Sequence, residues 1–540
     1  MRDYLLHHLL QRSAAQYPDN VAVIFKEKQM TYSELERQSN GVARALQQLG
    51  MRKGDRVGIM LSKSIEQIIA LFGILKAGAI YVPIDPAAPA VRVAYMIRHC
   101  GVECLITTSG YLKSLSRSED GSGISTALLI GTDAEVVNHG TIVSKSLSLD
   151  VEGARDSDGF QTMDMSDSSP AYILHTSGST GNPKGVAISH LNALTFIEMA
   201  AAYFDVTASD RFASHAPLHF DLSVFDIFVA IKQGAAIVLL PEMLSTFPVK
   251  LAEYIDKEQI TVWNSVSSVL TLLADKGVLE SRNLDSLRLV HFSGDIMPVK
   301  YLRLLAQRMK NAAFYNIYGQ TEANSSLCYP ITAIPDDDSW RIPIGKPFPN
   351  FDVFALNEER QVVSRPGDEG ELYVSSSTVA YGYWNDRDMS GEKFVPDPRY
   401  PFLDKIVYKT GDLVRIDEYG NYLFSGRTDH MVKSRGYRVE LAEIETVLSG
   451  HPDVVTAVAI PIPDDLVGNR IFAVIAPASG CSVGTEELVR YCTPRLPKYM
   501  IPETMTFRDS LPMTSSGKVD RKKLGEELVS SYESCVPGLL

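Results

Sequence analysis

Arg56-Val-Gly-Ile-Met60, Ile65-Glu-Gln-Ile-Ile-Ala-Leu-Phe-Gly-Ile-Leu75 and Ile80-Tyr-Val-Pro-Ile84 are the three stretches that decide the fold class. The first and third are short apolar runs of strand length, and the second is long enough for a helix. Strands that alternate with helices in this way are typical of a parallel, doubly wound sheet. The alternation returns further along, with short apolar runs at 236–240 and 287–292. The sequence therefore predicts an α/β protein.

Changes in composition mark the expected domain organisation. Residues 114–169 are rich in Ser, Asp and Gly, which predicts a surface excursion. A second break falls near 426–437, and the chain beyond it is long enough for a small α+β domain. We expect a large N-terminal domain with doubly wound sheets, residues 1–427, and a small mobile C-terminal domain, residues 428–540.

The composition argues against several classes of protein. Lys and Arg number 52 against 65 Asp and Glu, and a net charge of −13 does not suit a surface that follows nucleic-acid phosphates. The six cysteines are scattered, without a CxxC pair or a His cluster at zinc spacing, so we expect neither a disulfide framework nor a zinc knuckle. No apolar run approaches the roughly 20 residues of a membrane span, and the N-terminus lacks the apolar core of a signal peptide. We expect a cytoplasmic protein that binds neither nucleic acid nor membranes.

The most informative stretch is Tyr172-Ile-Leu-His-Thr-Ser-Gly-Ser-Thr-Gly-Asn-Pro-Lys-Gly-Val186, an apolar strand followed by a loop of Gly, Ser and Thr. Such a loop can place backbone N–H groups and hydroxyls around a polyphosphate, because glycines permit a close approach. It is not a Walker A loop, since the order Gly-x4-Gly-Lys-Ser/Thr is absent. A Gly/Ser loop taken alone fits a flexible turn equally well.

Together with other motifs, this loop resembles that of the acyl- and aminoacyl-adenylate-forming enzymes, which include acyl-CoA synthetases, luciferases and nonribosomal peptide synthetase adenylation domains. The resemblance runs from about residue 10 to about residue 525, keeps the family's motif order and is closest to stand-alone adenylation domains. In Asn316-Ile-Tyr-Gly-Gln-Thr-Glu322, Gln320 replaces the common Pro. The other motifs are 75–85, Phe220-Asp-Leu-Ser223, Gly370-Glu-Leu-Tyr-Val with Tyr381-Gly-Tyr, Tyr408-Lys-Thr-Gly-Asp-Leu413, Gly426-Arg-Thr-Asp429 and 511–521.

The resemblance implies that a carboxylate attacks the α-phosphate of ATP and that pyrophosphate leaves. It assigns Mg²⁺ to Glu322 and adenylation to Lys518, whose ammonium would offset the repulsion between the two reacting anions. Asp429 stands at the hinge, and domain rotation would present Lys518 for adenylation and the Gly436 loop for thioester formation. The ATP-binding residues would be Thr176, Ser177, Gly178, Ser179, Thr180, Gly181, Lys184, Asp295, Asn316, Tyr318 on adenine, Thr321 on the α-phosphate, Asp412 on the ribose and Arg427.

Motif alignment also gives a pocket for the acyl group. In the peptide-synthetase branch an Asp at the place of Asp221 pairs with the substrate's α-amino group, and a buried carboxylate is costly without a cation. The competing interpretation is a structural Asp that caps the following helix. His291 could bind a substrate hydroxyl or be a core histidine satisfied by a backbone carbonyl. The lining would be Asp221, Leu222, Phe225, Ser268, His291, Ser293, Ile317, Ser325 and Ser326.

The pocket residues favour two different substrates. The Asp-Leu-Phe at the start resembles the free-standing prolyl-adenylating enzymes of pyrrole biosynthesis. Four serines and a histidine in the rest of the lining are more polar than a proline ring requires, which favours a small polar amino acid. A β-amino acid would also satisfy Asp221.

The sequence contains no carrier-protein signature after Lys518, so the acceptor thiol would belong to a separate phosphopantetheinylated carrier protein or to CoA. We expect an AMP-forming ligase that uses ATP and Mg²⁺ to adenylate an amino acid and loads a carrier protein in trans. The alternatives are a prolyl-specific carrier-protein ligase, a CoA ligase of a small carboxylic acid, and a catalytically silent relative that serves as a nucleotide-binding or scaffold protein.

Overall fold

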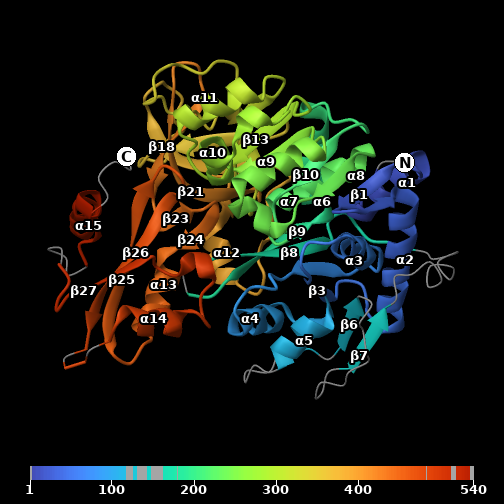
Figure 1. Ribbon diagram of the computed structural model, residues 1–540, viewed down its shortest axis with the longest axis horizontal. Coiled ribbons are helices and arrows are strands. Elements are labelled where there is room, and N and C mark those ends of the chain that lie inside the picture. Colours follow the sequence, from blue (N-terminus) through green and yellow to red (C-terminus); the bar gives the residue numbers. More distant parts are fainter. Residues whose placement is uncertain are drawn as a thin grey trace.

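The computed structural model describes residues 3–116, 124, 126–130, 143–147, 162–178, 181–478, 480–481, 483–512 and 519–535. Figure 1 shows a broad body in blue, green and yellow, with the C-terminal part in orange and red at its side. The α/β fold class with a large N-terminal and a small C-terminal part is confirmed. The boundary between residues 427 and 428 stays a prediction.

The first large sheet has the strand order β16-β15-β14-β13-β12-β10-β11-β1-β2 and is parallel except at its two ends. Trp263 and Val290 share a core with three helices on one face, whereas their neighbours Val262 and Leu289 belong to the core on the other face. This alternation is what a strand with two buried faces requires. The elements are β1 (Val21–Phe25), β2 (Lys28–Thr31), β10 (Arg211–Ser214), β11 (Ala236–Leu239), β12 (Val262–Val266), β13 (Leu289–Ser293), β14 (Ala313–Gln320), β15 (Asn324–Ile331) and β16 (Lys346–Pro347), with α9 (Pro248–Lys257), α10 (Ser267–Lys276) and α11 (Val299–Arg308).

The second large sheet has the order β19-β9-β8-β4-β3-β5-β6-β7, with parallel strands from β8 to β7. The expectation that 114–169 forms a surface excursion is wrong for 126–130 and 143–147, because these residues form β6 and β7 and extend this sheet. Much of the rest of 114–169 lies outside the described residues. The composition of the surrounding sequence, rich in Ser, Asp and Gly, gave no sign of these two short strands. The strands are β3 (Arg56–Met60), β4 (Ile80–Pro83), β5 (Val102–Thr107), β6 (Thr126–Ile130), β7 (Val143–Leu147), β8 (Pro170–Thr176), β9 (Lys184–Ser189) and β19 (Gly382–Tyr383).

Helices fill the space beside the two large sheets. Thr31 begins α2 with a complete capping box, and Ser189 does the same for α6, so both helices start at a side chain that satisfies free backbone N–H groups. The other face of the second sheet is covered by α4 and α5 through a separate apolar core. The helices are α1 (Leu6–Gln16), α2 (Tyr32–Gln48), α3 (Ile65–Lys76), α4 (Ala90–Cys100), α5 (Ser109–Ser116), α6 (His190–Tyr203), α7 (Leu222–Val224), the π-helix η2 (Phe225–Val229), α8 (Ala230–Gln233), and the 3₁₀ turns η3 (Glu242–Thr246) and η4 (Leu279–Ser281).

A third, antiparallel sheet joins the body to the C-terminal part. Its order is β17-β18-β21-β20, and β22 pairs with β21. Asp412 and Arg427 lie opposite each other in that last pair. The register of β21 and β22 thus brings together two residues that are predicted to bind ATP. The elements are β17 (Asp352–Leu356), β18 (Glu369–Ser375), α12 (Arg387–Lys393), β20 (Phe394–Pro396), β21 (Ile406–Ile416) and β22 (Tyr422–Arg427).

The C-terminal part consists of a hairpin, a small sheet and flanking helices. In Figure 1 the hairpin strands β23 and β24 lie beside the body, and α15 lies at the outer edge of the orange and red part. Separate apolar cores fill the two faces of the β25-β26-β27 sheet. The elements are β23 (Met431–Ser434), β24 (Tyr437–Glu440), α13 (Leu441–Ser449), β25 (Val454–Asp464), β26 (Gly468–Pro477), α14 (Thr485–Cys492), η5 (Lys498–Met500), β27 (Thr504–Phe507) and α15 (Arg521–Cys535).

Helix length and polarity bear on the expectation about membranes. Within the described ranges, none of the helices combines the length and the apolar character that crossing a bilayer requires.

Candidate functional site

The predicted phosphate loop follows β8 at the carboxyl end of the parallel strands, where ligands bind in open α/β sheets. Ser177 is buried there, and Lys184 begins β9 on the other side of the loop. Burial, together with the nearby Arg438 guanidinium, lowers the pKa of Lys184 to about 8. Ser179 and Thr180 lie outside the described residues, so their assignment stays a prediction. Thr176 is half-buried, and its hydroxyl has no hydrogen-bond partner among the described residues.

Glu322, the predicted Mg²⁺ ligand, is fully buried in the turn between β14 and β15. Both of its carboxylate oxygens accept hydrogen bonds from Arg438 Nη1 at 3.1 Å, and Oε1 also accepts one from the Tyr383 hydroxyl at 2.7 Å. Lys184 Nζ lies 3.9 Å from Glu322 Oε1. Burial by itself would raise the pKa of Glu322, but Arg438 and Lys184 lower it to about 2. The carboxylate is therefore ionised and suited to a cation.

The C-terminal part reaches into the phosphate loop itself. Ser177 Oγ donates to the Arg438 carbonyl at 2.9 Å, and Gly178 N–H donates to Glu443 Oε2 at 3.4 Å. A Cβ on Gly181 would meet the Thr446 side chain at 3.2 Å, which shows how closely α13 packs on the loop. Two groups predicted to hold phosphates thus have partners from β24 and α13.

The predicted ribose and adenine residues form a hydrogen-bonded group around Asp412. Its Oδ1 accepts from Arg427, and its Oδ2 accepts from the Tyr318 hydroxyl and, at 2.9 Å, from Gln320 Nε2. Gln320, which stands where Pro is common in the family, therefore contacts Asp412, the residue predicted to bind the ribose. In this arrangement the Tyr318 hydroxyl is directed at Asp412, and the packing of its ring on adenine stays a prediction.

Asp295 lies two residues after the end of β13, and Asn316 lies within the neighbouring strand β14. Asn316 Nδ2 donates to the Pro343 carbonyl at 2.8 Å, and Asp295 Oδ1 accepts from Ile296 N–H at 2.8 Å. Asp295 Oδ2 is buried without a partner among the described residues, and burial raises the pKa of this carboxyl to about 6. The backbone at Gly468 lies against it, because a Cβ there would stand 1.5 Å from Oδ2.

Asp221 lies immediately before α7, but it does not cap that helix. Its backbone is helical and its side chain makes no cap hydrogen bond, so the capping interpretation is wrong. Its Oδ2 instead accepts a hydrogen bond from Thr321 Oγ1 at 2.9 Å. The geometry thus connects the predicted amine-binding carboxylate to the predicted α-phosphate residue. Among the described residues no ion pair to Asp221 is closer than 4.0 Å, although the half-buried Lys433 of β23 is near enough to feel its charge.

The other predicted pocket residues come from adjoining elements. The His291 ring contacts Phe204 and Phe225, with centroid distances of 4.2 Å and 4.9 Å. Burial lowers the pKa of His291 to about 3, so the ring is neutral. His291 Nε2 and Ser326 Oγ are buried without hydrogen-bond partners among the described residues. The remaining members are Leu222 on α7, Phe225 on η2, Ser268 on α10, Ser293 on β13, Ile317 on β14 and Ser325 on β15.

The structure describes Asp429, the predicted hinge residue, but not Lys518, the predicted catalytic residue. Asp429 accepts hydrogen bonds from Arg427 at 2.6 and 2.8 Å, and its Oδ1 also accepts one from Met431 N–H at 3.2 Å. Burial would raise the pKa of Asp429, but Arg427 lowers it. Lys518 lies outside the described residues, and its role stays a prediction.

Sequence reasoning missed three residues that the structure places at this site: Tyr383, Arg438 and Glu443. Tyr383 belongs to the Tyr381-Gly-Tyr motif, and Arg438 follows the Gly436 loop, so both stood next to noticed positions. Glu443 had no such signal, because an acidic residue in the first turn of a helix is usual.

Comparisons with known proteins place this geometry in a family context. The family model described as AMP-binding enzyme matches residues 10–384, and the one described as AMP-binding enzyme C-terminal domain matches residues 443–518. An L-proline–L-prolyl-carrier-protein ligase of Pseudomonas fluorescens is 33% identical over 97% of this chain and 99% of its own length. Bacitracin synthase 1 of Bacillus licheniformis is 34% identical over 97% of this chain, which spans only 9% of that protein. The solved structure of NpsA-ThdA, an artificially fused adenylation-PCP di-domain NRPS from Klebsiella oxytoca, matches with a TM-score of 0.76 and 25% identity over 93% of each chain.

Proposed function

The chain belongs to the AMP-binding enzyme family, and from that premise we propose that it is an ATP-dependent ligase of an amino acid. It forms the aminoacyl adenylate with release of pyrophosphate. It then passes the aminoacyl group to the phosphopantetheine thiol of a separate carrier protein. The similarity to a prolyl-carrier-protein ligase over nearly the whole of both chains supports an acceptor thiol on a separate carrier protein.

One observation supports an amino acid more than any other acyl group: the contact between Asp221 and Thr321. The carboxylate is fixed beside the residue expected at the α-phosphate and has no cation within ion-pair distance among the described residues. A substrate ammonium there would provide the missing charge and hold the substrate carboxylate near the nucleotide.

The reaction needs positioning and neutralisation of charge more than covalent chemistry from the protein. We assign the departing phosphates to the loop from Thr176 to Lys184, the ribose to Asp412, and the approach of the two anions to Lys518. Glu322 fits a hard divalent cation, since it is buried and ionised. When bound, Mg²⁺ would supply charge neutralisation for the phosphates.

The contacts of Arg438 favour two successive arrangements of the C-terminal part. In the arrangement described, Arg438 donates hydrogen bonds to the Glu322 carboxylate, and the Glu443 carboxylate accepts one from Gly178 N–H. Both groups have to withdraw before the loop can hold phosphates and Glu322 can hold a cation. We therefore assign this docked arrangement to thioester transfer. We assign adenylation to an undocked one, in which rotation near Asp429 has taken Arg438 off Glu322 and brought Lys518 to the site.

The unsatisfied polar atoms of the pocket favour a small polar substrate. His291 Nε2 and Ser326 Oγ are buried without partners among the described residues, and a substrate hydroxyl would satisfy one of them. Proline is the second candidate, because the relative that matches along its whole length is named for it. A CoA ligase of a small carboxylic acid is the alternative in which Asp221 has no substrate role.

We place the reaction in the cytoplasm. Four of the described cysteines are buried free thiols, a usage that fits a reducing compartment.

The test is ATP–pyrophosphate exchange over the twenty protein amino acids, several β-amino acids and a panel of simple carboxylic acids. A response to one small polar amino acid would support the pocket assignment, and a response to proline would select the second candidate. A response to carboxylic acids alone would overturn the role of Asp221.

A further inference from the structure

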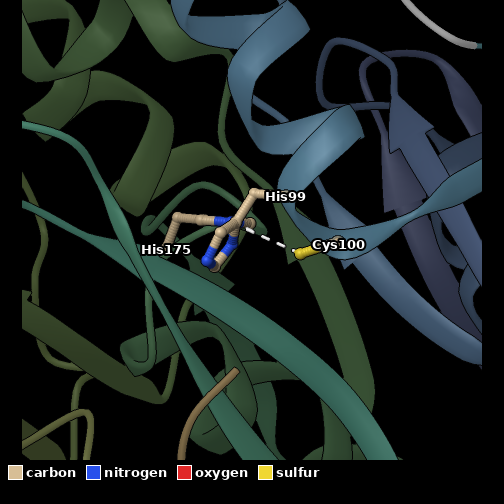
Figure 2. A group of neighbouring side chains, drawn as sticks. All are labelled: His99, Cys100 and His175. Carbon is tan, nitrogen blue, oxygen red and sulfur yellow. Dashed lines mark hydrogen bonds between the residues drawn. The ribbon is translucent and has the colours of Figure 1, made fainter. Parts of the chain in front are cut away.

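A cluster of potential metal ligands lies on the opposite side of β8 from the large apolar core. His99 and Cys100 end α4, and His175 is the last residue but one of β8. Tyr172 and Leu174 face the core shared with α3 and α6, whereas Ile173 belongs to the core shared with α4. Alternation along the strand therefore directs His175 towards α4, as Figure 2 shows.

The three side chains converge. Among the residues that the structure describes, one ligand atom each of His99, Cys100 and His175 lie within 4.8 Å of one another. Cys100 Sγ and His175 Nε2 are 3.5 Å apart, along the dashed line in Figure 2. Ligand distances of 2.3 Å for sulfur and 2.0–2.1 Å for nitrogen at a tetrahedral angle separate the two atoms by about 3.6 Å. This pair is thus already spaced as it would be around one zinc ion.

The ring nitrogens of the cluster lack other partners. His99 Nδ1 and His175 Nδ1 are both buried without a hydrogen bond within the described part of the chain. The His175 nitrogen that faces Cys100 Sγ is Nε2, so a metal would bind that atom, whereas ligation through Nδ1 would account for the unpartnered nitrogen of His99.

The surrounding residues hold the cluster's backbone in place. Arg56 donates to the carbonyls of Cys100 at 2.8 Å and Gly101 at 2.9 Å, and Asn385 Nδ2 donates to the His99 carbonyl at 2.8 Å. The end of α4 is therefore fixed against β3 and the segment after β19. Fixed ligands of this kind lose little freedom on binding a cation.

We propose that His99, Cys100 and His175 bind one zinc ion, with the fourth position open to water or another small ligand. Two imidazoles and a thiolate form a donor set that selects zinc over magnesium, which prefers oxygen. The site is separate from Glu322. It joins α4, whose Arg92 pairs with Glu443, to the strand that leads into the phosphate loop. Cys100 loses its proton to solvent when zinc binds.

The experiment uses the full chain in which two cysteines, the exposed Cys481 and Cys535, are both replaced by Ser, so that neither thiol contributes. Metal is removed with EDTA, the chelator is washed out, and Co²⁺ is added as a spectroscopic probe. We expect one equivalent of Co²⁺ to give a thiolate charge-transfer band and tetrahedral d–d bands, and one equivalent of Zn²⁺ to abolish them.

Two matched cysteine variants separate the site from general thiol binding. Cys100→Ser should lose the charge-transfer band and weaken Zn²⁺ binding by at least tenfold. Cys104→Ser removes another buried thiol, four residues along, and should behave like the parent chain. His175→Phe, which keeps a ring, tests the second ligand if Cys100→Ser does not fold. The absence of the band in the parent chain, or the same band in Cys100→Ser, would reduce the cluster to a thiol–imidazole hydrogen bond and overturn the proposal.

Discussion

Arg438→Met should separate the two half-reactions. The variant keeps an unbranched side chain but removes the guanidinium that donates to both oxygens of Glu322 at 3.1 Å. A hydrogen bond to a charged group contributes about 1.5–3 kcal/mol. That loss falls on the docked arrangement alone, so the ratio of docked to undocked molecules should drop by about 10- to 150-fold. Glu322 keeps Tyr383 and Lys184 as partners, so the fold should tolerate the change.

The quotient of two rates reports this change in the ratio, whatever fraction of the parent protein is docked. ATP–pyrophosphate exchange follows the undocked molecules, and single-turnover transfer from a preformed adenylate to pantetheine follows the docked ones. Their quotient, transfer over exchange, should fall about 10- to 150-fold in Arg438→Met. Arg508→Met is the matched control, because Arg508 pairs with Glu527 inside the C-terminal part. An unchanged quotient in Arg438→Met, or an equal fall in Arg508→Met, would refute the assignment of the docked arrangement to transfer.

Four further predictions concern single residues. Lys518→Ala should nearly abolish exchange while leaving transfer from preformed adenylate intact; wild-type exchange would remove its assigned role. Asp221→Ala should reduce exchange with amino acids by 100-fold or more, on the order of 3 kcal/mol for a lost charge partner, and unchanged exchange would count against the amine contact. Gly436 has φ +79° and a Cβ there would stand 2.8 Å from Val266, so Gly436→Ala should slow transfer but not exchange, and equal loss of both would contradict this. The folded-state pKa of Asp295 is raised to about 6 from 3.8, so its ionisation costs stability as pH rises through this window. Asp295→Asn should therefore be more stable than the parent by about 1–3 kcal/mol in urea unfolding at pH 7.5 and by much less at pH 4.5; a gain independent of pH would point to another cause.

The fold could be predicted from the sequence wherever apolar periodicity was strong. The helix expected at Ile65–Leu75 is α3, Ile65–Lys76, and the strands at Arg56–Met60 and Ile80–Ile84 are β3 and β4 with ends shifted by one residue at most. β6 and β7 were missed, because they lie in a segment rich in Ser, Asp and Gly and take their place in the sheet by pairing next to β5. Tertiary pairing of that kind leaves little trace in local composition.

The candidate site shows the same limit at the level of single residues. Motif order placed Asp221 and Thr321 in one site, and the structure brings them within hydrogen-bonding distance. No motif indicated that Arg438 would lie on Glu322, because that contact depends on how the C-terminal part docks. The neighbourhood of His175 and Cys100 was equally hidden, since 75 residues separate them and no short spacing signals the contact.

The contact of Glu443 with Gly178 has a consequence for the direction of the reaction. Under the role that we propose for the loop, this contact places a carboxylate of the chain itself where a pyrophosphate oxygen would otherwise return. A tethered group of this kind acts at an effective concentration of roughly millimolar order, however dilute the protein is. Pyrophosphate that re-enters from solution must compete with it, and so the finished adenylate is shielded from being turned back into ATP while the acceptor thiol arrives.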